Sequence, residues 1–212
     1  FDRGWMGVHL GMTGELRVEA AGWCGGRHDH LVLHQAQRTL VFFDPRMFGA
    51  IDFEPGEEPP LWWRERPPEI LEAGFTRKKV AQFLARRGRA PIKAVVLMQE
   101  QFPGIGNWMA DEVLWRAGIH PARAAGSLDE KEIAQLFRAL RFVCRGALRS
   151  IVPEANGTWG DPPKGWLFHV RWKPGGVCPA TGAKLKHDTI GGRTTCWSPK
   201  KQKLERPSRA KS

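Results

Sequence analysis

The chain has 212 residues, enough for one large domain or two small ones with a hydrophobic core. Its 33 Lys and Arg residues against 22 Asp and Glu residues give a net charge of +11, which favours a polyanionic partner over an acidic or neutral one. No apolar run reaches the ~20 residues that span a bilayer, the start lacks a secretory-signal layout, and four scattered cysteines are typical of a reduced intracellular protein.

Residues 1–54 are predicted to form short β-strands, and the run 40–43 is apolar on both faces, as in the central strand of a sandwich. Cys24, His28 and His30 have no fourth partner at zinc-like spacing, so we assign the histidines to a strand entry and not to a metal site. The expected strands are 5–10, 16–19, 31–35 and 39–44.

Residues 55–69 hold five of the sixteen prolines together with several acidic residues, which predicts a linker. Residues 70–155 then carry the 3.6-residue periodicity of helices. Thr76 is expected to cap the first helix, whose basic face is either solvated or turned toward a nucleic acid.

Pro91 is expected to begin a second, buried helix. Lys93 is the only charged side chain in its apolar stretch, so it must reach solvent or an anion. Further on, Ser127 and Glu130 are predicted to form a capping box for a long amphipathic helix that ends at Pro153.

A glycine-rich turn lies between these helices. Gly104 and Gly106 lead to Asn107, an expected N-cap, and the helix that follows should stop at Gly118. A glycine turn at a helix start exposes backbone N–H groups and the positive end of the helix dipole, which together bind phosphate. A tight inter-helix turn without a ligand is the alternative that the turn alone leaves open.

The run 102–121 as a whole resembles the helix–two-turns–helix signature of the formamidopyrimidine-DNA glycosylase and endonuclease VIII family. Related helix–two-turns–helix folds occur in ribosomal and topoisomerase proteins, so this run alone indicates nucleic-acid binding more firmly than it indicates a glycosylase. The matching residues are Gly104, Gly106, Asn107, Glu112 and residues 117–121.

Two further segments, 9–14 and 44–49, extend the resemblance. It implies that Met12, Arg46 and Phe48 enter the duplex and fill the gap that a flipped nucleotide leaves. The alternative is that Met12 and Phe48 are ordinary core residues. Met47 stands where the family has a second arginine, which puts the preference for the opposite base in doubt.

The resemblance also implies phosphate contacts, because Lys93 and Asn107 keep the family's spacing of lysine and asparagine. The loop 156–165 corresponds by position to a loop over the extruded base. The implied DNA-binding residues are Lys93, Gly104, Gly106, Asn107 and Arg193.

Residues 166–202 resemble the family's β-hairpin finger, in which four cysteines bind zinc. Here Cys178 keeps the first position, while the other three fall on Thr181, Ser198 and Lys201. Tetrahedral zinc needs four ligands, so we expect a zincless finger and no cofactor. Cys178, His187 and Cys196 are the only other candidates, and their spacing is unsuitable. Packing by Trp172 and Trp197 with Leu185 and Ile190 is expected to replace the metal.

The basic tail, residues 203–212, suits nonspecific attraction to a phosphate backbone. Members of the family begin upstream with a proline whose amine attacks the sugar, assisted by a glutamate. Neither precedes the first strand here, so the resemblance implies that residues 1–212 bind DNA without performing the chemistry.

The sequence therefore predicts an α+β protein with a partial N-terminal β-sandwich, a helical helix–two-turns–helix domain and a C-terminal zinc-finger-like β-hairpin. The resemblance implies base-excision repair, with DNA glycosylase and abasic-site lyase activity of the full-length protein on oxidised bases. We expect its partner to be double-stranded DNA with a damaged base or abasic site, and we expect a monomer in a bacterial cytoplasm, at the nucleoid. A non-catalytic DNA-structure binder is the alternative.

Overall fold

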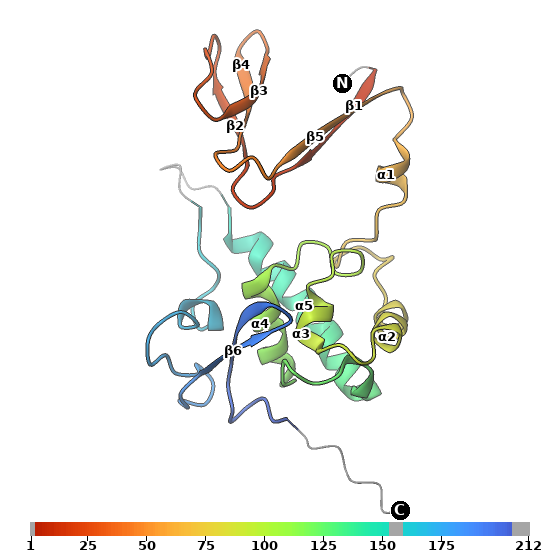
Figure 1. Ribbon diagram of the computed structural model, residues 1–212, viewed down its shortest axis with the longest axis vertical. Helices are drawn as coiled ribbons and strands as arrows, with labels where there is room; N and C mark the ends of the chain where they lie inside the picture. Colours follow the sequence, from red (N-terminus) through yellow and green to blue (C-terminus); the bar gives the residue numbers. More distant parts are fainter. Residues whose placement is uncertain (1–2, 153–158, 205–212) are drawn as a thin grey trace, which may run out of the picture. The chain divides into compact units, whose positions relative to one another are not determined.

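The computed structural model describes residues 3–152 and 159–204 (Figure 1). The fold is α+β, as predicted: strands come first, helices follow, and a β-hairpin closes the described chain. The chain divides into two compact units, Phe1–Arg66 and Pro67–Ser212. Their boundary falls within the segment 55–69, where the prolines cluster.

The N-terminal unit contains two small antiparallel sheets. One pairs β1 with β5, and the other has the order β2-β4-β3. The central position of β4 agrees with the prediction for 40–43, since Val41 and Phe42 are buried. The fifth strand was not predicted. The strands are β1 (Gly4–His9), β2 (Glu15–Ala20), β3 (Asp29–His34), β4 (Arg38–Phe43) and β5 (Ala50–Pro55).

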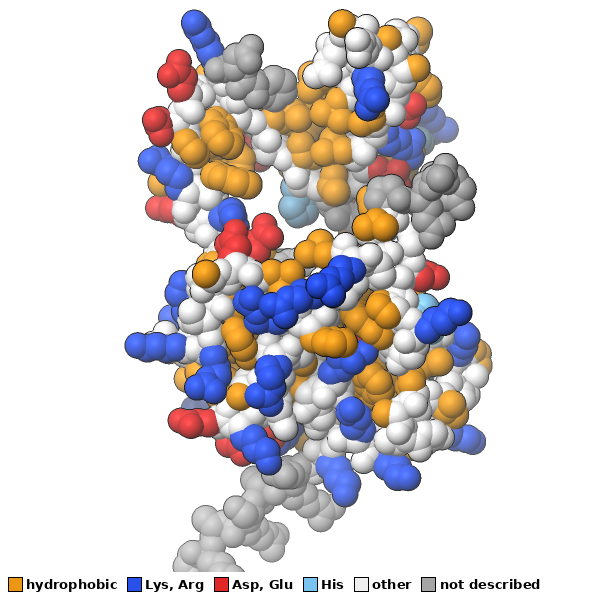
Figure 2. Space-filling model, turned by 180° about the vertical axis from the view of Figure 1, so that it is seen from behind, with side chains coloured by type: hydrophobic (Ala, Val, Ile, Leu, Met, Phe, Trp, Pro, Cys, Tyr) orange, Lys and Arg blue, Asp and Glu red, His pale blue; other side chains and the backbone are white. Residues whose placement is uncertain are grey.

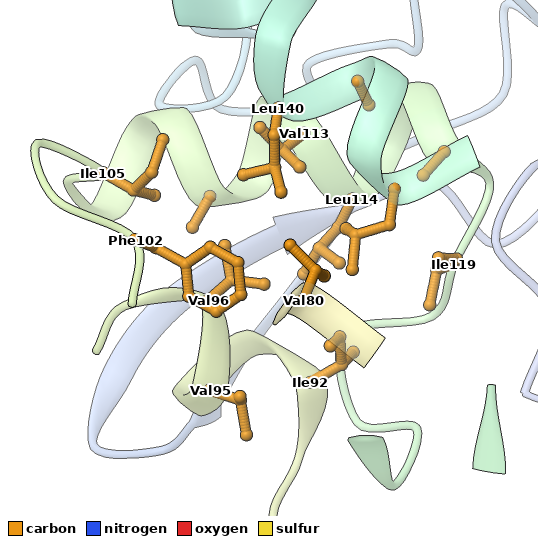
Figure 3. Packing of buried hydrophobic residues seen from close by; sticks show 14 of the residues in the cluster. Val80, Ile92, Val95, Val96, Phe102, Ile105, Val113, Leu114, Ile119 and Leu140 are labelled. Carbon is orange, nitrogen blue, oxygen red and sulfur yellow. The ribbon is translucent and has the colours of Figure 1, made fainter. Parts of the chain in front are cut away.

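The second unit is built around one hydrophobic core (Figure 3). Val80, Val113 and Leu140 come from three different helices, and each is fully buried. A short helix, α1 (Leu61–Arg64), precedes this unit in what was predicted to be a plain linker. The other elements are α2 (Arg77–Arg86), α3 (Ile92–Val96), α4 (Asn107–Ala117), η1 (Ala125–Ser127), α5 (Glu130–Ser150), η2 (Leu167–His169), β6 (Lys186–Ile190) and β7 (Arg193–Trp197).

The helix caps test the sequence rules directly. The Thr76 hydroxyl accepts from the Lys79 N–H at 3.3 Å, as predicted. The capping box of α5 was predicted two residues too early, because it is formed by Asp129 and Glu132. Ser127 instead ends the η1 turn, where its hydroxyl donates to the Ala124 carbonyl at 2.8 Å. Pro153 lies outside the described residues, and α5 ends at Ser150.

The β6–β7 hairpin packs within the helical unit and is not a separate body. Its two-residue turn is Gly191-Gly192, with φ of 61° and 73°, which is the backbone that a tight right-twisted hairpin requires. A Cβ on Gly191 would lie 2.7 Å from the Ala94 Cβ, so only glycine allows the turn to approach α3 this closely. No helix in the described part of the chain is long and apolar enough to cross a membrane.

Candidate nucleic-acid interface

The glycine turn before α4 is held by one side chain, Gln99. The Gly104 N–H donates to Gln99 Oε1 at 2.8 Å, and Gln99 Nε2 donates to the Ile105 carbonyl at 3.0 Å. Gly104 has φ of 78°, a conformation that favours glycine. The turn is therefore rigidly placed at the start of an eleven-residue helix.

Gly106, and not Asn107, is the N-cap of α4, and no side chain in the described part of the chain caps the helix. The first N–H groups of α4 are therefore left for an outside acceptor. A Cβ on Gly104 or Gly106 would meet nothing within 4 Å, so the turn faces open space. Free N–H groups, the positive end of the helix dipole and an open approach are the three features that an anion-binding helix start requires.

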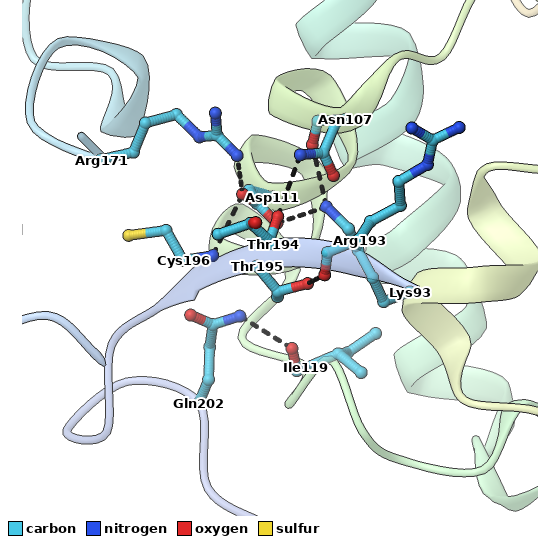
Figure 4. A network of polar contacts seen from close by, with 10 residues as sticks. All are labelled: Lys93, Asn107, Asp111, Ile119, Arg171, Arg193, Thr194, Thr195, Cys196 and Gln202. Carbon is cyan, nitrogen blue, oxygen red and sulfur yellow. Dashed lines mark hydrogen bonds and ion pairs between the residues drawn. The ribbon is translucent and has the colours of Figure 1, made fainter. Parts of the chain in front are cut away.

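The Asn107 side chain has a different task from the predicted cap. Its Nδ2 donates to the Thr194 carbonyl of β7 at 2.9 Å, so it ties the start of α4 to the hairpin (Figure 4). One amide N–H of Asn107 remains for a ligand. This bond spans 87 positions in the sequence, and no local pattern could have indicated it.

Asp111, one turn further along α4, is the hub of a buried polar network (Figure 4). It forms ion pairs with Lys93 of α3 and with Arg171, and it accepts the Cys196 N–H of β7 at 3.1 Å. All three charged side chains are buried. Two cations share one carboxylate, so the network leaves an excess positive charge beneath the hairpin.

Lys93 does not lie where a phosphate contact requires it. Its ammonium is fully buried, pairs with Asp111 and also donates to the Asn107 carbonyl at 2.8 Å. Burial lowers the pKa of Lys93, and the charge of Asp111 opposes that shift. The expectation that Lys93 must reach an anion is met by Asp111, whereas the implied contact with DNA does not fit this position.

Arg193 opens β7 directly after the turn, and its side chain is exposed. The side chain extends on the same side of the hairpin as Asn107 (Figure 4). The Thr195 hydroxyl bonds to the Arg193 carbonyl at 3.0 Å and stiffens the start of the strand. The Asn107–Thr194 bond thus links the start of α4, which follows Gly104 and Gly106, to the strand that begins at Arg193.

The N-terminal unit organises its two predicted loops around Asp44. This carboxylate accepts from the Thr13 hydroxyl at 3.2 Å, from the Arg46 N–H at 3.2 Å and from the Gly49 N–H at 2.7 Å. These bonds lower the pKa of Asp44, with the Gly49 N–H contributing most. One buried acid therefore fixes both loops to each other.

The side chains on these loops are exposed. Met12 is 69% exposed and Phe48 is 56% exposed, which contradicts the alternative that they are core residues. The Arg46 guanidinium lies 4.9 Å from the centre of the Phe48 ring. Two apolar side chains and a cation thus project from one rigid pair of loops, and their insertion into DNA stays a prediction.

Met12→Ala and Phe48→Ala should each weaken binding to a duplex with a one-nucleotide gap roughly tenfold, because stacking on an unpaired base contributes ~1–3 kcal/mol. Binding to the intact duplex should change much less. Val18→Ala, at a strand position that is 63% exposed, is the matched control. Fluorescence anisotropy measures both affinities, and equal losses on the two duplexes would contradict the wedge role.

Two of the other finger positions, Thr181 and Ser198, lie beside the Cys178 thiol. Trp115 Nε1 donates to Cys178 Sγ at 3.3 Å, and the Lys201 ammonium lies 4.7 Å from the centre of the Trp115 ring. Burial raises the pKa of Cys178, but Ser198, Thr181 and Trp115 outweigh it and lower the pKa to about 7. Ser198 lowers the pKa of the thiol from close by, although its Oγ forms no well-aligned hydrogen bond to any described residue.

Zinc does not fit this site. The neighbours of Cys178 are hydroxyls and an indole, which are not zinc ligands. His187 Nε2 is engaged by the Arg171 carbonyl at 2.5 Å. Within the described residues, no group of three or more His, Cys, Asp or Glu side chains could hold a metal ion.

The predicted tryptophan packing is only partly correct. Trp172 is 59% exposed and lies against the Arg171 guanidinium, so it does not replace the metal. Trp197 packs edge-on against His120, with ring centres 4.2 Å apart. The finger's small core instead joins buried side chains of α4, η2, the segment before β6, and β7. They are Trp115, Leu167, Cys178 and Cys196, and Val170 and Leu185 pack against them.

A chelator should therefore leave duplex binding and the thermal melt unchanged, because hydrogen bonds and apolar packing hold the hairpin. Metal analysis of protein purified without chelator should find no stoichiometric zinc. A structural zinc ion contributes several kcal/mol to folding, so its removal would lower the melting temperature visibly. Stoichiometric zinc or loss of binding on chelation would contradict the zincless assignment.

Two family models match this chain. Residues 67–153 match the formamidopyrimidine-DNA glycosylase H2TH domain, and residues 1–51 match the formamidopyrimidine-DNA glycosylase N-terminal domain. A formamidopyrimidine-DNA glycosylase of Roseiflexus sp. is 35% identical over 95% of this chain and 76% of its own length. One of Herpetosiphon aurantiacus is 41% identical over 89% of this chain and 70% of its own length. The chain belongs to the formamidopyrimidine-DNA glycosylase family.

Solved structures of the family share the fold. Lactococcus lactis Fpg in complex with DNA that contains an abasic site has a TM-score of 0.82 at 27% identity. MutM in complex with DNA that contains carbocyclic 8-oxo-G has the same TM-score and identity. Each comparison covers 96% of this chain and 76% of the solved chain. The family fold therefore extends through both units and the hairpin.

Sequence reasoning missed Asp111 and Arg171 as the supports of the interface. A signal for an acidic partner was present, because an unpaired lysine in an apolar helix requires one, but α4 offers both Asp111 and Glu112. Arg171 lies 60 positions from Asp111 in an irregular segment and had no signal.

Proposed function

We propose that this chain is a base-excision-repair protein that binds damaged double-stranded DNA and belongs to a DNA glycosylase and abasic-site lyase. The observation that carries the proposal is the arrangement at α4. An open, uncapped helix start lies beside the exposed Arg193, and Asn107 links the two through Thr194. The backbone N–H groups at the start of α4 can bind one phosphate, and the Arg193 guanidinium can bind another with two parallel N–H groups.

The exposed Met12, Arg46 and Phe48 support a damaged substrate over an intact one. Their apolar surface has a partner in DNA only where a base has left the stack. The solved relatives are described as complexes with abasic-site or modified-base DNA, which supports the same class of substrate. The relatives are named as glycosylases, so a purely structural DNA binder is not favoured.

The lyase chemistry needs an amine that attacks the sugar. Lys93 is not that amine, because its ammonium is buried and paired with Asp111. We assign to residues 1–212 the tasks of binding the backbone and filling the duplex. We also propose that the protein acts at the nucleoid in a bacterial cytoplasm, since the similar proteins are bacterial, and that it acts as a monomer.

A salt titration tests the proposal. Affinity for a duplex with an abasic-site analogue should fall steeply with salt, because each neutralised phosphate adds roughly 0.9 to the slope of log affinity against log salt concentration. Contacts at the α4 start and at Arg193 alone predict a slope of about two. An affinity that does not depend on salt would contradict phosphate binding.

A further inference from the structure

The second half of α5 carries an unusual concentration of positive charge. Between residues 133 and 151 there are four arginines and no acidic residue. Like charges three and four positions apart on a helix repel one another, so this pattern costs stability unless a partner relieves it. The arginines are Arg138, Arg141, Arg145 and Arg149.

Among the described residues, Arg141 is the one of these four with hydrogen-bond partners, since it donates to the carbonyls of Ile70 at 3.0 Å and Leu71 at 3.2 Å. The other three are exposed and form no ion pair within the described residues. On the face of the helical unit that Figure 2 shows, Lys and Arg side chains lie among hydrophobic ones, with acidic side chains toward the edges.

These arginines line a groove of about 890 Å³ whose lining residues include no acid. Trp166 packs closely on α5 at Gly146, where a Cβ would lie 2.4 Å from the ring. Phe142 is 52% exposed within the groove, and its ring centre is 6.1 Å from that of Trp166. The groove thus combines arginines with an exposed aromatic ring.

The groove is not the phosphate site at the start of α4. A second hollow, lined by Gly104 of the glycine turn, is bordered on α5 by Cys144, Ala147 and Leu148. At 3.6 residues per turn, that side of α5 is about 140° around the helix axis from Arg138, Phe142 and Arg145. The two surfaces lie on different sides of one helix.

We propose that this arginine groove is a second nucleic-acid contact and that it binds an unpaired DNA strand. Arginines in a groove attract the phosphates, and an exposed aromatic ring among them offers a base a surface to stack on. The Arg116 guanidinium lies 4.4 Å from the centre of the Phe142 ring, so a base would stack on the part of the ring that stays exposed. A duplex keeps its bases inside the stack and would offer that surface no base. An acidic peptide would pair with the arginines but would gain nothing specific from the ring.

Anisotropy with a labelled oligothymidylate of about 12 nucleotides tests the proposal on the whole chain. The triple variant R138Q/R145Q/R149Q should weaken binding at least ~10-fold and reduce the log–log salt slope by about two, since each phosphate on a single strand contributes ~0.7. Phe142→Ala should weaken it about tenfold through lost stacking. Glutamine is a good helix former and all four positions are exposed, so the thermal melt should not change.

The matched control is R77Q/K78Q/K79Q, which removes three exposed charges from α2. An equal loss of affinity with this control would show that the effect comes from net charge alone, and it would overturn the proposal. Loss of oligothymidylate binding in Arg193→Ala would also overturn it, because the single strand would then bind at the α4 site. Polyglutamate that competes as well as the oligonucleotide would indicate an acidic protein partner instead. Duplex affinity, measured in parallel, tests the proposed function separately.

Discussion

Asp111→Ala is expected to destabilise the helical unit by ~3–5 kcal/mol, because it leaves the Lys93 ammonium and the Arg171 guanidinium buried without a counter-charge. The Cys196 N–H loses its acceptor as well. For a unit of this size the loss corresponds to a fall in melting temperature of roughly 10–20 °C. Thermal denaturation followed by circular dichroism measures it.

Two companion variants make this result specific. Lys93→Met should cost only ~1–2 kcal/mol, because it leaves Arg171 and Asp111 as a balanced pair and conserves the length of the side chain. Glu100→Ala breaks an ion pair whose side chains are 48% and 58% exposed, and should cost less than ~1 kcal/mol. If Lys93→Met destabilised the unit as much as Asp111→Ala does, the sharing of one carboxylate by two cations would be the wrong description.

Arg193→Ala should weaken binding to abasic-analogue duplex roughly ten- to a hundredfold while leaving the melting temperature unchanged. The side chain is exposed and forms no ion pair among the described residues, so the fold does not depend on it. A charge-assisted bond to phosphate contributes ~1.5–3 kcal/mol, which sets the size of the loss. Arg193→Lys should restore only part of the affinity, because an ammonium cannot bind phosphate with two parallel N–H groups.

Lys184→Ala is the matched control, since Lys184 is another exposed cation two residues before β6. Its removal should change affinity by less than about twofold beyond the general effect of one charge. Equal losses in the two variants would mean that the hairpin acts only through net charge, and Arg193 would have no specific contact.

Local chemistry explains which elements the sequence could predict. The side chain of Thr76 indicates a helix start, and the backbone freedom of Gly118 indicates a helix end. Both lie where expected. The capping box was misplaced because residues 127 and 130 and residues 129 and 132 satisfy the same spacing rule, and only the η1 turn decides between them. Asn107 was wrong as a cap because Gly106 already supplies the required backbone conformation.

The pairing of the residues that support the site could not be predicted from the sequence, because it depends on tertiary neighbours. The residues predicted to touch DNA sit in turns with recognisable glycines, so the sequence could single out Gly104, Gly106 and Arg193. The residues that hold those turns in place pair across long stretches of chain, as Asp111 does with Arg171 and Cys196. Lys93 was assigned to DNA for the same reason, since its spacing to Asn107 is visible and its burial is not.

The most direct test of the account is the affinity of residues 1–212 for a duplex with one abasic-site analogue, compared with the intact duplex of the same sequence. Fluorescence anisotropy at moderate salt measures both. The account predicts binding to the abasic duplex at least ~10-fold tighter, equal to about 1.4 kcal/mol, because only that duplex offers a gap to Met12 and Phe48. Equal affinities for the two duplexes would contradict the recognition of damaged DNA by this chain.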